Sequence, residues 1–188
     1  GQADNHSRLD LAYLVSDPWK LDSEPERARF RGTSERLERA FGRPRTILEV
    51  GCGEGIQSEY FARQCDHLTG IDVSARAIER ARSRLPAAEF LIGDLVAQPW
   101  ANDVGRFDVV VACEVIYYMR DVPAFLAAMS RLGRGCMVTY FAAAERKMGQ
   151  FVRVIQGVAM ETLTHREASW HIATWKPGRS LAKMGAAM

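Results

Sequence analysis

The sequence lacks long apolar runs and a strong excess of charge of either sign. No uncharged apolar stretch approaches the roughly 20 residues that a membrane-spanning helix needs, so we expect no membrane association through such a helix. The 25 basic residues nearly balance the 23 acidic ones and leave a net charge of +2. Because nucleic-acid and anionic-lipid surfaces attract concentrated positive charge, we expect neither kind of partner.

Cysteine is also scarce, and the four cysteines at positions 52, 65, 113 and 136 form no Cys-x-x-Cys pair. The spacing of zinc sites and of redox motifs is therefore missing, and the histidines add no metal-ligand spacing. We expect four buried, reduced thiols, no metal site and a cytoplasmic protein. The first thirty residues, which carry four aspartates and no apolar leader, agree with that location.

What the sequence does contain is an alternation of short β-branched runs with stretches of helical spacing. Strands are predicted at residues 46–50, 67–71, 89–92, 107–113 and 135–141, and helices at 24–41, 56–65, 74–85, 122–132 and 146–156. This alternation is typical of a parallel sheet with helices packed on it. The link between two final strand-like runs, 159–163 and 169–175, is too short for a crossover helix, which predicts an antiparallel hairpin.

Three glycines, Gly51, Gly53 and Gly55, directly follow the first predicted strand. Glycine lets a backbone turn sharply and approach a ligand closely, although a plain strand-to-helix turn needs glycine as well. Asp72 ends the second strand, roughly 20 residues later, where a carboxylate can accept both hydroxyls of a ribose. The glycine spacing differs from the G-x-G-x-x-G of dinucleotide sites, and the nearby carboxylate of Glu49 suits an ammonium or sulfonium better than a pyrophosphate.

Acidic residues follow the third and fourth predicted strands too. Asp94 comes after the third strand, placed to reach an adenine amine, and Glu114 directly follows the fourth. The carboxyl ends of parallel strands meet at one edge of an open sheet, which is where such sheets bind ligands. The sequence therefore predicts one nucleotide-like ligand at this edge.

In order and spacing together, these segments resemble the class I S-adenosylmethionine-dependent methyltransferases. The matching stretches are residues 49–55, 70–74, 93–95 and 107–115, and the resemblance covers about residues 45–175. Residues 17–22 (Asp-Pro-Trp-Lys-Leu-Asp) and 112–118 (Ala-Cys-Glu-Val-Ile-Tyr-Tyr) are more closely similar to the NodS-type nodulation N-methyltransferases. Those enzymes methylate the free amine of a deacetylated chitooligosaccharide.

The resemblance implies a Rossmann-like, doubly wound α/β fold. Its mostly parallel seven-stranded sheet would have an antiparallel last strand, helices on both faces and an extra N-terminal helix. We expect an N-terminal lid and helix extension at residues 1–42, the methyltransferase domain at 43–178 and a C-terminal tail at 179–188. The chain would be a monomer or weak dimer acting on a small-molecule or oligosaccharide acceptor, with S-adenosyl-L-methionine as cofactor and S-adenosyl-L-homocysteine as product.

The resemblance also assigns residues to the methionine part of that cofactor. The three glycines would pass beneath it, Glu49 would orient its ammonium, and Arg29 or Arg31 would clamp its carboxylate. Glu114 and Val115 would lie beside the sulfonium.

The adenosine part would have its own set of residues. Asp72 would hold the ribose hydroxyls, and Val73 would flank the adenine. Asp94 would take the adenine amine, and Leu95 would offer a backbone amide. Trp19, in a polar segment near the start, is the expected lid residue.

An amine nucleophile must be neutral to attack a methyl group, so a group near the reactive end has to accept its proton or hold its N–H groups. We assign this role to Glu114, with Tyr117 or Tyr118 as the orienting hydroxyl or aromatic wall. The alternative is that Glu114 is a structural carboxylate on the cofactor side.

Other functions are weighed against this hypothesis. A metal-free small-molecule O-methyltransferase and a non-catalytic S-adenosylmethionine-binding protein both remain open. A methyltransferase of nucleic-acid bases would carry an Asn/Asp-Pro-Pro-aromatic run where this chain has residues 112–115. A nicotinamide oxidoreductase does not fit the glycine spacing or the terminal hairpin.

Overall fold

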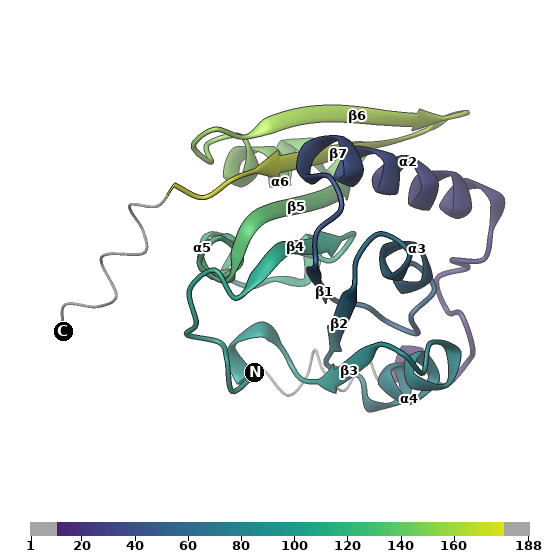
Figure 1. Cartoon of the computed structure of the whole chain (residues 1–188). Coiled ribbons are helices and arrows are strands. Elements are labelled where there is room, and N and C mark those ends of the chain that lie inside the picture. The colour runs from purple at the N-terminus through teal and green to yellow at the C-terminus, as the bar shows by residue number, and fades with distance from the viewer. Residues whose placement is uncertain (1–10, 179–188) are drawn as a thin grey trace.

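A seven-stranded sheet forms the centre of the computed structural model, which describes residues 11–178 of the chain. The first ten residues and the expected tail at 179–188 lie outside the described residues. The strands are β1 (Thr46–Val50), β2 (His67–Asp72), β3 (Glu89–Ile92), β4 (Phe107–Cys113), β5 (Gly133–Phe141), β6 (Ala159–His165) and β7 (Ala168–Trp175). Their order across the sheet is β3-β2-β1-β4-β5-β7-β6 (Figure 1). The first five strands are parallel, and β7 runs antiparallel to both β5 and β6, so the predicted sheet and hairpin are confirmed.

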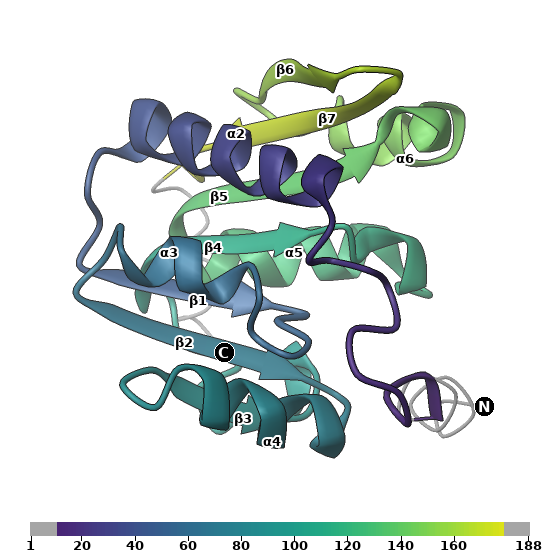
Figure 2. The ribbon, with the colours of Figure 1, turned by 90° about the vertical axis from the view of Figure 1, so that its right-hand side faces the viewer.

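Helices cover both faces of this sheet. They are α2 (Glu24–Phe41), α3 (Ser58–Ala62), α4 (Ala75–Arg84), α5 (Val122–Leu132) and α6 (Glu145–Val152). Figure 2 shows α2, α3 and α4 in front of the sheet, with α5 and α6 behind it. Side-chain caps fix two helix starts: Ser74 accepts a hydrogen bond from the Ala77 amide, and Asp121 accepts one from the Ala124 amide.

The strand β4 shows why its apolar run predicts burial on both faces. Val109 and Val111 pack with residues of α2 and α3, whereas Val110 and Ala112 pack with residues of α5. Successive side chains of a strand point to opposite faces, so a strand between two helical layers is apolar throughout.

Two helices are shorter than their sequence pattern predicts. α3 begins at Ser58 rather than at residue 56, because Gly55 has a φ of +80° and the chain is still turning there. It ends three residues before the predicted end, where the Gln64 amide donates to the Phe61 carbonyl in a tighter turn. α6 ends at Val152 rather than at 156, and Gly157 with a φ of +72° then turns the chain toward β6.

The predicted chemistry of the cysteines agrees with their places in the fold. All four are buried and free of disulfides. Burial raises the pKa of the Cys65 thiol to about 11 and of the Cys113 thiol to about 12, which makes them poor nucleophiles. In residues 11–178, no group of three or more acidic, histidine or cysteine side chains is arranged to hold a metal ion. No helix in that part of the chain has the length and apolar character to cross a membrane.

Candidate functional site

The glycine loop joins β1 to α3 at the carboxyl edge of the sheet. Gly51 and Gly53 have φ values of +74° and +54°, in the region that favours glycine. A Cβ on Gly51 would collide with the Cγ1 atom of Val115, and one on Gly53 would lie 2.9 Å from the Tyr13 hydroxyl. Both glycines therefore allow a close approach of other groups to the loop.

Gly55 has a different role from the other two glycines. Its φ is +80°, and a Cβ there would lie 3.2 Å from the Cβ of Ala81 on α4. The third glycine of the motif thus allows a helix to pack closely against the loop.

Asp72 lies at the end of β2, beside the glycine loop. Its Oδ2 accepts a hydrogen bond of 2.9 Å from the Gly53 amide, and its Oδ1 accepts one of 2.9 Å from the Ser74 amide. An ionised carboxylate has about four lone-pair sites, so these bonds orient the group and leave it able to accept from a ligand. Val73, half-buried, follows it.

The end of β3 is tied to the end of β2, because the Gly93 amide donates to the Asp72 carbonyl at 2.8 Å. Asp94 caps the short 3-10 helix Leu95–Ala97 by accepting from the Ala97 amide at 2.9 Å. Leu95 itself is buried in the core. The structure thus brings the predicted ribose and adenine residues to one edge of the sheet.

Glu49 is the buried carboxylate of this region, with a residue exposure of 3%. It is on β1, and the Ser58 hydroxyl at the start of α3 donates to its Oε2. Burial raises the pKa of Glu49 to about 8, against the opposing effects of that hydrogen bond and of nearby Arg29. A neutral carboxyl at this place would ionise when a cation binds next to it.

Arg29 on α2 is the buried cation of the same region, with a residue exposure of 2%. Its Nε and Nη2 donate to Glu26 Oε2, and its Nη1 donates to Gln57 Oε1 at 3.2 Å. Arg31, the other predicted clamp, is exposed. A guanidinium has five N–H donors, so Arg29 retains two for a ligand after these three bonds.

Glu114 follows β4 with a φ of +59°, a conformation that costs a residue with a side chain about 1–2 kcal/mol. Its two carboxylate oxygens are both held: Oε1 accepts from the Tyr117 hydroxyl at 3.0 Å, and Oε2 accepts from the Thr139 hydroxyl at 2.8 Å. Burial raises the pKa of this carboxyl, against the lowering effects of Arg29 and of the two hydroxyls. Strain of this kind persists where the surroundings fix a group in one orientation.

The two predicted tyrosines have separate places. Tyr117 donates to Glu114, and its hydroxyl oxygen accepts from the amide of Phe141 at the end of β5. Burial raises the pKa of Tyr117, so its hydroxyl stays protonated. Tyr118 is 47% exposed and contacts the Tyr117 ring edge-on. Of the two, Tyr117 is the one that orients Glu114.

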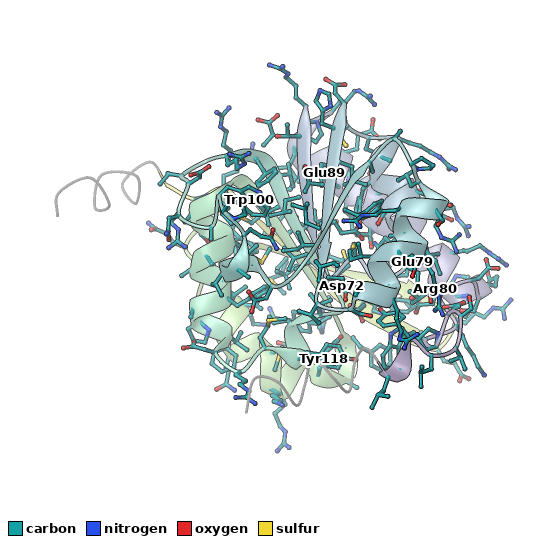
Figure 3. The ribbon with its side chains drawn as sticks, turned by 90° about the horizontal axis from the view of Figure 1, so that it is seen from below. Asp72, Glu79, Arg80, Glu89, Trp100 and Tyr118 are labelled. Atoms are coloured by element: carbon teal, nitrogen blue, oxygen red, sulfur yellow. The ribbon has the colours of Figure 1, made fainter. Side chains whose placement is uncertain are left out.

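Residues 11–23 form an N-terminal strap that runs past the strand ends of β1, β2 and β4 (Figure 2). Glu54 on the glycine loop is buried, accepts from the Asp17 amide at 3.1 Å and forms an ion pair with the half-buried Arg80 of α4. Arg80 also donates to the Val15 carbonyl at 2.9 Å. Figure 3 shows Arg80 and Asp72 in the same part of the molecule as Tyr118.

The strap places its aromatic residues against the loop. Tyr13 is buried and lies over Gly53, close enough to Asp72 for that carboxylate to raise its pKa together with burial. Trp19, the predicted lid residue, is 46% exposed and lies beside Tyr13. Tyr13, which is not among the predicted site residues, therefore joins Trp19 in the lid hypothesis.

Several contacts of the site come from residues that sequence reasoning missed, namely Glu26, Glu54, Gln57, Ser58, Arg80 and Thr139. Each is a common polar residue at an unremarkable place in its helix, loop or strand. One signal was available for two of them, because Gln57 and Ser58 follow the glycine loop directly.

A family model and several of the most similar relatives identify one family. The model of the family described as Nodulation protein S (NodS) matches residues 1–142. The Nodulation protein S of Bradyrhizobium diazoefficiens is 34% identical over 131 residues, which are 70% of this chain and 63% of that protein. That of Rhizobium tropici is 35% identical over 134 residues, 70% of this chain and 55% of that protein. The chain thus spans about three-fifths of the length of these relatives.

A solved structure gives the same result for the fold. The N-methyltransferase NodS from Bradyrhizobium japonicum WM9, in complex with S-adenosyl-L-homocysteine, superposes with a TM-score of 0.74 at 25% identity. The superposition covers 92% of this chain and 98% of that one. The Rossmann-like fold predicted from the sequence is therefore confirmed.

Replacement of Arg80 with Ala should release the strap. The change leaves the buried Glu54 carboxylate without its cation and removes the hydrogen bond to the Val15 carbonyl. The free energy that holds the strap in place should fall by about 1–3 kcal/mol. We expect chymotrypsin to cleave at Tyr13 and Trp19 at least about fivefold faster than in the wild type, since 1 kcal/mol gives roughly that factor. Lys147→Ala, which removes an exposed cation of α6, is the control. Equal cleavage of the Arg80 variant and the control would contradict the role of this ion pair.

Proposed function

The chain belongs to the NodS family, and from this premise we propose that it binds S-adenosyl-L-methionine at the glycine loop and transfers its methyl group to an amine. The proposal includes the assignment of site residues, because the relatives are longer than this chain and their activity is not carried over by similarity alone.

One observation carries the proposal: a buried cation and a buried carboxyl lie together at the glycine loop. Arg29 and Glu49 are both at least 97% buried, and adjacent residues hold them, since Gln57 accepts from Arg29 and Ser58 donates to Glu49. The methionine part of the cofactor has a carboxylate and an ammonium, which need a partner of each sign. The two remaining N–H donors of Arg29 fit the carboxylate, and an ionised Glu49 fits the ammonium.

The rest of the edge fits the adenosine part. Gly51 and Gly53 leave room against the loop that a Cβ would fill. Two backbone amides hold Asp72, whose carboxylate would accept from the ribose hydroxyls, and Asp94 on the adjoining turn would accept from the adenine amine. Val73, Leu95 and Val115 complete the expected set as apolar or backbone contacts.

The bound cofactor supplies an activated methyl group on a sulfonium, which passes to a nitrogen lone pair as the carbon–sulfur bond breaks and a carbon–nitrogen bond forms. The protein then has to align the acceptor and remove a proton. Alignment in a closed site is worth about 7–11 kcal/mol of the barrier. The strap, whose Tyr13 is buried against the glycine loop, is the element that would exclude water.

Glu114 is the group we assign to the acceptor amine. Tyr117 and Thr139 each donate to one of its oxygens, so the carboxylate has one fixed direction and can still accept an N–H from the amine. Its raised pKa brings it nearer to the range in which it can take a proton from the amine. A carboxylate suits an amine better than an alcohol, because it binds the ammonium form and also accepts its proton.

The net charge of the chain bears on the class of methyl acceptor. We propose a small-molecule or oligosaccharide amine rather than a nucleic acid, since the chain has a net charge of only +2. The four free buried thiols are consistent with a protein of the cytoplasm. We further propose that the chain acts as a monomer or weak dimer.

The proposed reaction is tested by measuring release of S-adenosyl-L-homocysteine with a panel of acceptors. The panel pairs primary and secondary amines, including an oligosaccharide with one free amine, with the matching alcohols and phenols. We expect turnover with amines only. Turnover with alcohols alone would replace the proposal with O-methylation, and tight cofactor binding without turnover on any acceptor would favour a binding protein without catalytic activity.

Affinity for S-adenosyl-L-homocysteine should rise with pH between about 6 and 8. In the free protein the pKa of Glu49 is raised to about 8, so below that pH the carboxyl is mostly neutral. The ammonium of the ligand favours the ionised carboxylate, so binding requires loss of the proton and tightens by up to about tenfold for each pH unit. Above about 8 the carboxylate is already ionised, so the rise in affinity should end, and affinity should fall as the ligand's ammonium loses its proton.

Calorimetry in two buffers of different ionisation enthalpy measures the proton release at pH 7. In Glu49→Gln the released proton should disappear, together with the rise of affinity with pH. A wild-type affinity that is constant from pH 6 to 8 would show that Glu49 does not bind the ammonium.

Replacement of Glu114 with Gln should slow methyl transfer about a hundredfold or more, since a positioned proton acceptor contributes that much. Glutamine keeps the size of the side chain and an oxygen for one hydroxyl, so the dissociation constant of S-adenosyl-L-homocysteine should change less than about threefold. Single-turnover kinetics and calorimetry separate the two quantities. Glu35→Gln, an exposed change of equal charge on α2, is the control. Normal turnover of the Glu114 variant would assign this carboxylate a structural role.

A further inference from the structure

Gln57 has a buried hydrogen-bond donor that no group in residues 11–178 satisfies. The residue is 6% exposed, and its amide nitrogen Nε2 is shielded from solvent without a hydrogen-bond partner. Buried donors in native proteins nearly always have partners, because an unpaired one costs stability. An unpaired donor at a functional edge of a fold therefore needs an explanation.

The orientation of this amide is fixed by its other end. Gln57 Oε1 accepts from Arg29 Nη1 at 3.2 Å. A guanidinium has donors and no acceptor, so the amide oxygen has to face Arg29, and rotation of the amide would place two donors against each other. The Nε2 group is thus a fixed N–H donor within one side-chain length of the guanidinium.

Other buried polar atoms without partners in that part of the chain have different surroundings. They are Thr33 Oγ1, Ser34 Oγ, Arg36 Nε, Gln64 Oε1 and Arg131 Nε. Gln57 is the one among them that hydrogen bonds to Arg29, and it follows the glycine loop by two residues. Its neighbour Ser58 holds Glu49. Adjacent residues of α3 and its first turn therefore position the cation and the carboxyl of the proposed ligand site.

We propose that Gln57 is a ligand-binding residue whose Nε2 donates to the same carboxylate that Arg29 binds. This inference rests on the proposed function, in which that carboxylate belongs to the methionine part of the cofactor. Arg29 contributes the charge and two N–H donors, and Gln57 adds a third donor from the facing helix. Ligand binding would give the buried Nε2 group a hydrogen-bond partner. Part of the binding free energy would therefore come from removing the destabilisation that the unpaired donor causes in the free protein.

The test compares two ligands that differ in the amino-acid group. S-adenosyl-L-homocysteine has the carboxylate, and 5′-methylthioadenosine keeps the adenosine and the sulfur without it. In Gln57→Leu we expect the affinity for S-adenosyl-L-homocysteine to fall about tenfold or more and the affinity for 5′-methylthioadenosine to stay within about twofold. The Leu variant also removes the acceptor of the buried Arg29 Nη1, so the melting temperature of the ligand-free variant should fall.

A second variant separates ligand binding from the positioning of Arg29. Gln57→Glu keeps an oxygen for Arg29 and removes the N–H donor. It should therefore lower the affinity for S-adenosyl-L-homocysteine at least as much as the Leu variant does. Gln64→Leu, at the other end of α3, is the matched control and should leave the ratio of the two affinities unchanged.

Two other results would contradict the inference. If both Gln57 variants keep the wild-type ratio of the two affinities, the inference is overturned, and a lowered melting temperature in that case would identify the amide as a structural group. If the wild type binds neither ligand, the proposed function fails first and the inference fails with it.

Discussion

The buried guanidinium of Arg29 is the interaction on which the candidate site depends. A charge with 2% residue exposure is tolerated only when partners surround it, and here Glu26 and Gln57 do so from α2 and from the start of α3. The same group opposes the rise that burial causes in the pKa of Glu49 and of Glu114. One cation therefore links the N-terminal helix, the glycine loop and the end of β4.

This arrangement makes α2 part of the site as well as of the core. Leu37 of α2 packs with β1 and β4 residues, and Gly32 lets the helix approach Leu163 of β6. A helix fixed by such packing holds Arg29 in place more firmly than a mobile extension would. The strap is held differently, through polar contacts of Glu54 and Arg80, and that is the kind of attachment expected of an element that opens.

The fold could be predicted from the sequence wherever local patterns were strong. The spans of α2, β3, β4 and α5 agree with their predicted ranges, because apolar periodicity, capping residues and prolines act within a few residues of each other. The helix after the glycine loop was predicted too long. Its limits depend on the positive φ of Gly55 and on the turn after Phe61, which periodicity does not report.

For the candidate site, the sequence by itself determined the loop and the acidic residues that end β1, β2, β3 and β4, since the carboxyl ends of parallel strands have to meet at one edge. Tertiary structure alone decided the rest. Arg29 rather than Arg31 faces the loop, and Tyr117 rather than Tyr118 holds Glu114. The contacts of the candidate site join residues far apart in the chain, such as Arg29 with Gln57 at a separation of 28 residues and Glu114 with Thr139 at 25. Which side of a helix faces a loop and which strand lies beside another depend on packing across the whole sheet, and no local pattern of residues contains that information.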